Sequence, residues 1–169
     1  MSNQYDFQNI IAIKLLIRNG DKILLVREPE FNEWMPNRLG LPGGKPLLNE
    51  TLEETLKRKI KSEVGLEITI EGIVKIIDII MPEKTVYHLL IAAKYISGEI
   101  GENKTESDDI RWYTRDQVAT MEKDEFTEYY NKEFIKLYLD NSLTVTPLDI
   151  IHYQDNRSGA VSNWMQSGH

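Results

Sequence analysis

The stretch from Gly43 to Leu66, GGKPLLNETLEETLKRKIKSEVGL, constrains the fold more than any other part of the sequence. Thr51 and Glu54 have the spacing of a capping box, in which the threonine side chain accepts from an amide of the first helical turn and the glutamate reaches back to the cap. The spacing therefore predicts a helix that begins near Leu52. Gly65 suits the left-handed residue that ends such a helix.

The same helix carries an apolar stripe with one residue at every fourth position, formed by Leu52, Leu56, Ile60 and Val64. Residues with this spacing share one face of a helix, and we expect that face to pack on a β-sheet. The two glycines before the helix allow close approach of the backbone to a ligand. The stretch thus predicts a glycine turn followed by an amphipathic helix.

This stretch resembles a Nudix box. That pattern reads glycine, five residues, glutamate, seven residues, then Arg-Glu-apolar-x-Glu-Glu-x-Gly-apolar, and it aligns without a gap over residues 44–66. A tryptophan followed by Leu-Pro-Gly-Gly commonly precedes the box, and Trp34 with residues 41–44 is similar to it. Two positions depart from the pattern, because Lys59 and Ser62 stand where the family has glutamates.

The resemblance extends over about residues 8 to 140 and implies an α/β fold, a Nudix-type α/β/α sandwich with a mixed β-sheet. The residues agree with it, since runs rich in β-branched side chains predict strands at 10–18, 22–27, 67–81, 85–97 and 110–113. Asn19-Gly20 supplies the residues of a tight hairpin turn between the first two. Thr114 suits the N-cap of a helix that follows the strand at 110–113.

A further helix is predicted from Asp124 to Asp140, where Phe126, Tyr130, Phe134, Leu137 and Tyr138 recur at helical spacing. We interpret this aromatic stripe as part of the core rather than as a ligand site. We expect residues 1–140 to form the Nudix domain and residues 141–169 to form a C-terminal extension that packs on the domain or on a second subunit. The extension could also dock as an extra strand or stay partly disordered.

Composition limits the possible partners. The absence of cysteine excludes disulfides and thiolate metal sites. The formal net charge of -7 argues against nucleic-acid binding, which usually needs a basic face. The sequence has neither a signal pattern nor an apolar run long enough to cross a bilayer, so we expect a cytoplasmic protein without membrane association.

Hydrolysis of a nucleotide pyrophosphate needs neutralised phosphate charge and an activated water, which divalent cations held by carboxylates and carbonyls provide. On a helix that turns about 100° per residue, positions 59, 62 and 63 share one arc beside the apolar stripe. By the resemblance, Glu63 is a metal-ligating and catalytic glutamate, and Gly43 supplies a carbonyl ligand. The loop from 99 to 109 would add a further carboxylate, for which Glu106 is a candidate along with Glu99 and Glu102.

Glu50 and Arg58 match the first glutamate and the arginine of the pattern. In the family these residues help to fix the loop and the helix, and we include them among the catalytic candidates. A purely structural role for Glu50, as an acid near a helix start, is equally consistent with the sequence. Lys45 and Lys59 are candidates for contact with a phosphate.

Lys59 cannot ligate a metal while it is charged, and Ser62 adds no negative charge. We therefore expect Mg²⁺ or Mn²⁺ to bind weakly. The prediction is a Nudix-family hydrolase that cleaves the pyrophosphate bond of a nucleoside diphosphate linked to another moiety, with weakened activity. The alternative is a noncatalytic nucleotide-ligand binding or sensor domain, or a protein-interaction module, on the same fold. In the first two cases the partner is a nucleotide-like small molecule, and the chain could also form a homodimer.

Overall fold

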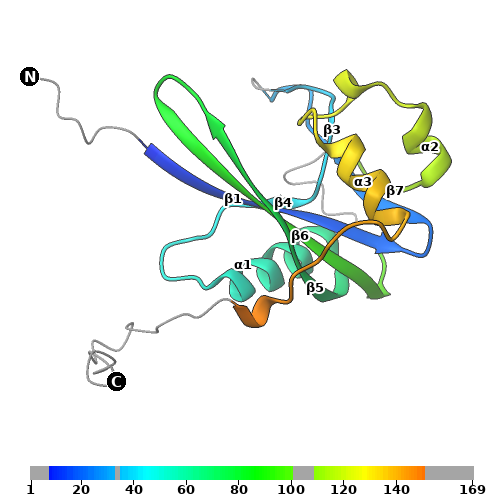
Figure 1. Ribbon diagram of the computed structural model, residues 1–169, viewed down its shortest axis with the longest axis horizontal. Helices are drawn as coiled ribbons and strands as arrows, with labels where there is room; N and C mark the ends of the chain where they lie inside the picture. Colours follow the sequence, from blue (N-terminus) through cyan, green and yellow to red (C-terminus); the bar gives the residue numbers. More distant parts are fainter. Residues whose placement is uncertain (1–7, 33–34, 101–108, 151–169) are drawn as a thin grey trace, which may run out of the picture.

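The computed structural model describes residues 8–32, 35–100 and 109–150 (Figure 1). The strands are β1 (Gln8–Asn19), β2 (Lys22–Arg27), β3 (Leu39–Gly40), β4 (Gly43–Gly44), β5 (Leu66–Ile80), β6 (Lys84–Gly98) and β7 (Asp109–Thr114). The α-helices are α1 (Leu52–Lys59), α2 (Arg115–Thr120) and α3 (Asn131–Leu139), with a π-helix η1 (Ile60–Val64) and 3-10 turns η2 (Lys123–Glu125) and η3 (Leu148–Ile150).

The strands form one mixed sheet. Its central order is β3-β2-β1-β6-β5, with β4 paired to β1 and β7 paired to β2. β1 and β6 run parallel, whereas the other pairs are antiparallel. The predicted hairpin between β1 and β2 is confirmed: Asn19 pairs with Lys22, and Gly20 between them adopts a φ of 61°. A positive φ is costly for most residues, so glycine suits this turn.

Helices cover both faces of the sheet, with α1 and η1 on one side and α2 and α3 on the other (Figure 1). A hydrophobic core lies on each face of the sheet, and alternate residues of β1 pack into one or the other, because successive side chains of a strand point to opposite faces. Leu15 and Ile17 pack in the cluster that contains the α1 stripe, and Leu16 packs in the cluster that contains Ile135 of α3. The predicted α/β/α sandwich is therefore confirmed.

The box helix begins as predicted. The Thr51 hydroxyl accepts from the Glu54 N–H at 3.2 Å, and the Glu54 carboxylate accepts from the Thr51 N–H at 2.7 Å, which completes the capping box. Gly65 ends the helix in the left-handed conformation, with φ 78°. The apolar stripe is confirmed as well, since Leu56, Ile60 and Val64 are all buried.

The sequence predicts an α-helix along the whole box, but the structure departs from this in the second half. From Ile60 it continues as a π-helix, and the Gly65 N–H donates to the Ile60 carbonyl at 3.1 Å. This wider i→i+5 turn places one extra residue between hydrogen-bond partners. The arc calculated for positions 59, 62 and 63 at 100° per residue therefore does not apply beyond residue 60.

The helix predicted for 124–140 is also shorter than expected, because α3 begins only at Asn131. Phe126 forms an isolated bridge to Leu39, and the Thr127 N–H donates to the Leu39 carbonyl at 2.9 Å. Backbone pairing with β3 thus replaces the helical bonds that this segment would otherwise make. Phe126, Tyr130 and Tyr138 are nevertheless buried, as the aromatic stripe predicted.

Part of the segment after α3 lies against the edge strand β5. Thr146 and Ile73 exchange two backbone hydrogen bonds, of 2.7 and 2.9 Å. Neighbouring Gly72 has φ 150°, and a Cβ there would overlap the Thr146 carbonyl, so the close approach requires glycine. The role of residues 141–169 as an extension stays a prediction, and residues 151–169 lie outside the described part of the chain. Among the described residues, no helix has both the length and the apolar character needed to span a bilayer.

Candidate active site

A cavity of about 830 Å³ lies against the glycine turn. Its walls come from β1, the glycine turn, the loop between β2 and β3, β6, and the segment before α3. The turn is held to β1 because Gly43 pairs with Lys14 and the Leu15 N–H donates to the Pro42 carbonyl at 2.8 Å. A Cβ at Gly43 would lie 1.9 Å from the backbone oxygen of Ile13, so only glycine fits this approach.

Lys59 reaches from the end of α1 to the second glycine of the turn. A Cβ at Gly44 would lie 2.4 Å from Lys59 Cε and 3.2 Å from its Nζ. The lysine side chain therefore lies against the backbone of the turn. Its ammonium therefore lies beside Gly44, which lines the cavity.

Glu50 and Arg58 form an ion pair that ties the loop before the helix to the helix. Arg58 Nε and Nη2 donate to the two carboxylate oxygens of Glu50 at 2.5 and 2.8 Å. Glu50 also accepts from the Leu47 N–H at 2.8 Å and the Thr55 hydroxyl at 3.0 Å. The bonds from Arg58, and then that from Leu47, hold the pKa of Glu50 at about 2. Both oxygens thus serve the local structure, and the catalytic role assigned to this pair stays a prediction.

The structure describes the contacts of some of the remaining predicted site residues but not of all of them. Lys45 lines the cavity, and its carbonyl accepts from Arg58 Nη2 at 3.5 Å. The Ser62 hydroxyl donates to the Arg58 carbonyl at 2.5 Å. Glu63 lies in the π-helix, but its side chain is outside the described part of the structure, as are the whole of Glu106 and Trp34. The structure therefore places Gly43 and Lys45 in the lining of the cavity and Lys59 against Gly44. The Glu50–Arg58 pair is joined to the Lys45 carbonyl through Arg58.

Sequence reasoning missed an ion pair in the wall of the cavity. Lys14 Nζ lies 2.9 Å from Glu128 Oε1, and the two side chains are only 17% and 13% exposed. Glu128 Oε2 accepts from the Asn131 amide at 2.7 Å and from the Thr127 hydroxyl. Burial alone would raise the pKa of Glu128, but Lys14 and the hydrogen bonds outweigh it and hold the pKa below its ordinary value.

A second missed pair lies beside the first. His88 Nδ1 and the Tyr130 hydroxyl are 2.5 Å apart, and both residues are buried and line the cavity. Burial, and then the Lys14 ammonium, lower the pKa of His88, whereas burial and the Glu128 charge raise the pKa of Tyr130. Both side chains are therefore neutral at pH 7, and the cavity wall contains one compensated charge pair and one neutral hydrogen bond.

The sequence contains one indication of the pair formed by Lys14 and Glu128. Lys14 is the single charged residue inside the apolar run from 10 to 17, at a position whose alternation with Ile13 and Leu15 places it on one face of the strand. Glu128 likewise interrupts an aromatic stretch. Their pairing could not be predicted, because more than a hundred positions separate them in the chain.

A mixed sheet between helices, with a glycine turn and a capped helix beside a cavity, defines the Nudix class of fold. A family model described as the NUDIX domain matches residues 8–137, and the chain therefore belongs to the Nudix family. Nudix hydrolases act on nucleotide-like substrates and generally use divalent metal ions. No curated protein sequence matches this chain significantly.

Solved structures of the family are similar to the chain over most of its length. A NUDIX hydrolase from Nitrosomonas europaea matches with a TM-score of 0.71 and 18% identity, over 87% of this chain and 98% of that one. A MutT protein from Methanosarcina mazei Go1 matches with 0.66 and 24%, over 82% and 97%. An ADP-ribose pyrophosphatase from Streptococcus suis 89-1591 matches with 0.58 and 22%, over 79% and 91%. At these identities the similarity shows the fold alone.

The described residues fit a divalent cation poorly. Among the residues that the structure describes, no three acidic or histidine side chains gather as ligands. The Gly43 carbonyl is a possible ligand, but Lys59 brings an ammonium against the adjacent glycine, and Ser62 is uncharged. Hard cations such as Mg²⁺ are bound through one or more carboxylates, and an ammonium repels them. The part of the site that the structure describes therefore lacks the charge that holds a metal.

Proposed function

We propose that this chain binds a nucleoside diphosphate linked to another moiety and hydrolyses its pyrophosphate bond slowly. The observation that supports this proposal is the glycine turn, which joins β1 at the wall of a cavity of about 830 Å³. Sites for small ligands usually have volumes of about 300 to 1,000 Å³. Membership of the Nudix family favours pyrophosphate chemistry at this turn.

Lys45 supplies positive charge in the wall of the cavity, directly after the glycine turn. Its ammonium attracts phosphate oxygens, and this attraction strengthens where water is excluded. The Glu50–Arg58 pair fixes the loop that carries Lys45, so we assign this pair a positioning role. Homodimer formation and a cytoplasmic location stay predictions.

A second candidate function is binding without hydrolysis. It is favoured by Lys59, whose side chain lies against Gly44 where the family pattern has a glutamate. A lysine in this place adds positive charge for a phosphate and removes a ligand for the metal. The chain would then act as a sensor or binding domain for the same class of nucleotide.

A metal titration with a restored box distinguishes the two functions. The wild type and the Lys59→Glu/Ser62→Glu variant are incubated with a panel of nucleoside diphosphate conjugates and triphosphates, with Mg²⁺ or Mn²⁺ from micromolar to tens of millimolar, and product release is measured. Slow wild-type turnover that rises with metal supports the hydrolase. Turnover by the variant alone supports the binding function, since the pocket is then intact and only the catalytic charge is missing.

The control variant is Lys61→Glu, which alters charge on the same helix at an exposed position. It should not change turnover, because no contact joins Lys61 to the glycine turn among the interactions described. Absence of both turnover and calorimetric binding across the whole panel, in the wild type and in the restored variant, would refute both functions.

A further inference from the structure

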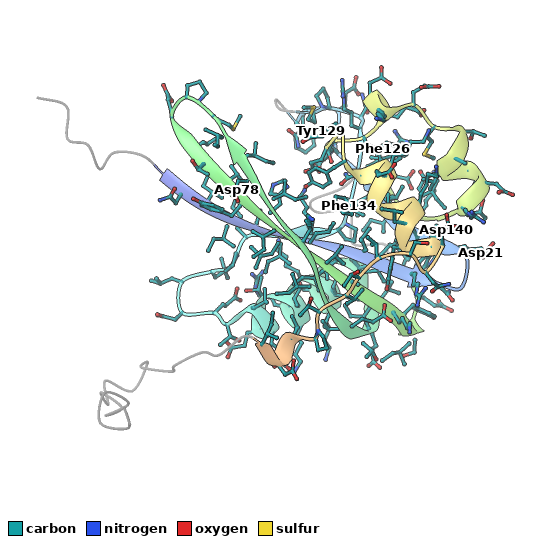
Figure 2. The ribbon with its side chains drawn as sticks, in the orientation of Figure 1. Asp21, Asp78, Phe126, Tyr129, Phe134 and Asp140 are labelled. Carbon is teal, nitrogen blue, oxygen red and sulfur yellow. The ribbon has the colours of Figure 1, made fainter. Side chains whose placement is uncertain are left out.

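We propose that Tyr129 is a specificity-determining residue of the cavity, where its ring stacks on an amino-bearing purine. This inference rests on the proposed function and names the class of nucleotide that the site takes. Tyr129 lines the cavity although 78% of the residue is exposed. Figure 2 shows Tyr129 near the start of α3, close to Phe126 and on the opposite side of the sheet from α1.

The backbone that carries Tyr129 is held in place on both sides. Glu128 before it is fixed by Lys14 and Asn131, and Tyr130 after it is buried and bonded to His88. The Tyr129 ring meets the Tyr130 ring edge-on, with centroids 5.8 Å apart at 77°. An aromatic side chain that is exposed on a rigid support loses little entropy when a flat ligand covers it.

The ring of Tyr130 is supported in turn by other aromatic groups. Its centroid lies 5.9 Å from that of Phe134 and 6.2 Å from that of His88, both in edge-on geometry. This series runs from the core to the cavity and ends at Tyr129. A flat aromatic ligand would extend it by one ring, and purines offer a larger stacking face than pyrimidines.

An acceptor for the edge of the ligand ring lies in the same cavity. Glu28 Oε2 accepts from the Asn32 amide at 2.7 Å. Glu28 Oε1 and Thr127 Oγ1 both approach Gly40, at 3.6 and 3.0 Å from the position of a Cβ there. Glu28, Thr127 and Tyr129 all line this cavity. A carboxylate accepts N–H groups and cannot donate, so this wall favours a ring that carries an amino group.

Calorimetric binding tests this assignment, with EDTA present so that turnover does not interfere. The probes are ADP, UDP and inorganic pyrophosphate, and the variants are Tyr129→Ala, Tyr129→Phe and Glu28→Gln. We expect ADP to bind the wild type more tightly than UDP. Tyr129→Ala should weaken ADP binding about tenfold and leave pyrophosphate binding unchanged, whereas Tyr129→Phe should bind ADP like the wild type. Glu28→Gln should weaken ADP binding about fivefold.

Phe31→Ala is the matched control, because Phe31 is 81% exposed but is not among the residues that line the cavity. It should leave ADP binding unchanged. Equal ADP affinity in the wild type and Tyr129→Ala would overturn the stacking role and leave the proposed function standing. A loss of pyrophosphate binding in Tyr129→Ala would also overturn it. If the wild type binds none of the three probes, either in EDTA or with Mg²⁺, the proposed function fails and this inference fails with it.

Discussion

The largely buried ion pair between Lys14 and Glu128 provides the sharpest test of the cavity wall. Replacing Lys14 by Met keeps the length of the side chain and removes its charge. Glu128 then stays in a place where only 13% of its side chain is exposed, without its cationic partner. We expect a large loss of stability from this single substitution, because a buried carboxylate without a counter-charge is costly.

The magnitude follows from the contacts that remain. Removing one partner of a buried pair costs about 3 to 5 kcal/mol. Glu128 keeps the hydrogen bonds from the Thr127 hydroxyl and the Asn131 amide, and both members of the pair retain some exposure. We therefore expect about 3 kcal/mol for Lys14→Met at pH 7.5, the lower end of that range. The double variant Lys14→Met/Glu128→Gln should regain all but about 1 kcal/mol, because no charge is then buried alone.

The loss should depend on pH with a defined sign. In the wild type the pKa of Glu128 is lowered, so its contribution is complete at both pH 7.5 and pH 5 and disappears only below the ordinary carboxylate range. In Lys14→Met, burial dominates and raises the pKa of Glu128, so the cost is relieved as the pH falls and the carboxylate takes up a proton. Burial is the main cause of the lowered pKa of His88 and remains in the variant, but removing Lys14 relieves the smaller part that comes from its charge, which acts in the same direction.

The assay is urea unfolding followed by tryptophan fluorescence and circular dichroism at pH 7.5 and pH 5. Lys57→Met is the matched control, because Lys57 pairs with Glu53 on the surface, with side chains 74% and 61% exposed. It should unfold like the wild type. Wild-type stability of Lys14→Met at pH 7.5, or a loss that does not shrink at pH 5, would refute the reasoning.

Two further predictions concern the glycine turn and the loop beside it. Gly43→Ala should lower the free energy of unfolding by about 3 kcal/mol, since its Cβ would meet the backbone oxygen of Ile13. The Cβ of Gly44→Ala would meet only the flexible end of Lys59, so this variant should lose less than about 1 kcal/mol. Equal losses for the two variants in urea unfolding would contradict this. The pKa of Glu50 is lowered to about 2, so its carboxylate stabilises the fold fully at pH values above the ordinary carboxyl pKa. This stabilisation is lost as the pH falls toward 2, and Glu50→Gln lacks it at every pH. The stability difference from the wild type should therefore shrink between pH 5 and pH 2, and a constant difference would count against the ion pair.

Much of the frame could be predicted because its signals are local. The capping box needs only Thr51 and Glu54, and the hairpin needs only a glycine between two apolar runs. The long strands β5 and β6 were predicted to within a few residues, because β-branched runs bounded by turn residues rarely form anything else.

The errors arose where distant backbone competes with local preference. Residues 124–130 have helical spacing, yet Thr127 donates to Leu39, and so α3 begins only at Asn131. The last turn of the box helix widens into a π-helix while Ile60 and Val64 remain buried. Neither change is visible in a periodic pattern, because each depends on what the segment packs against.

The sequence by itself determined the family, the ranges of the long strands, the start of the box helix, and the absence of two glutamates from the box. These properties depend on residues within one turn or one strand of each other. Only the tertiary structure decided that Lys59 lies against Gly44 and that Lys14 meets Glu128 in the wall of the cavity. The folding of the sheet brings such residues together across long stretches of chain, and the chemistry of the site depends on those distances.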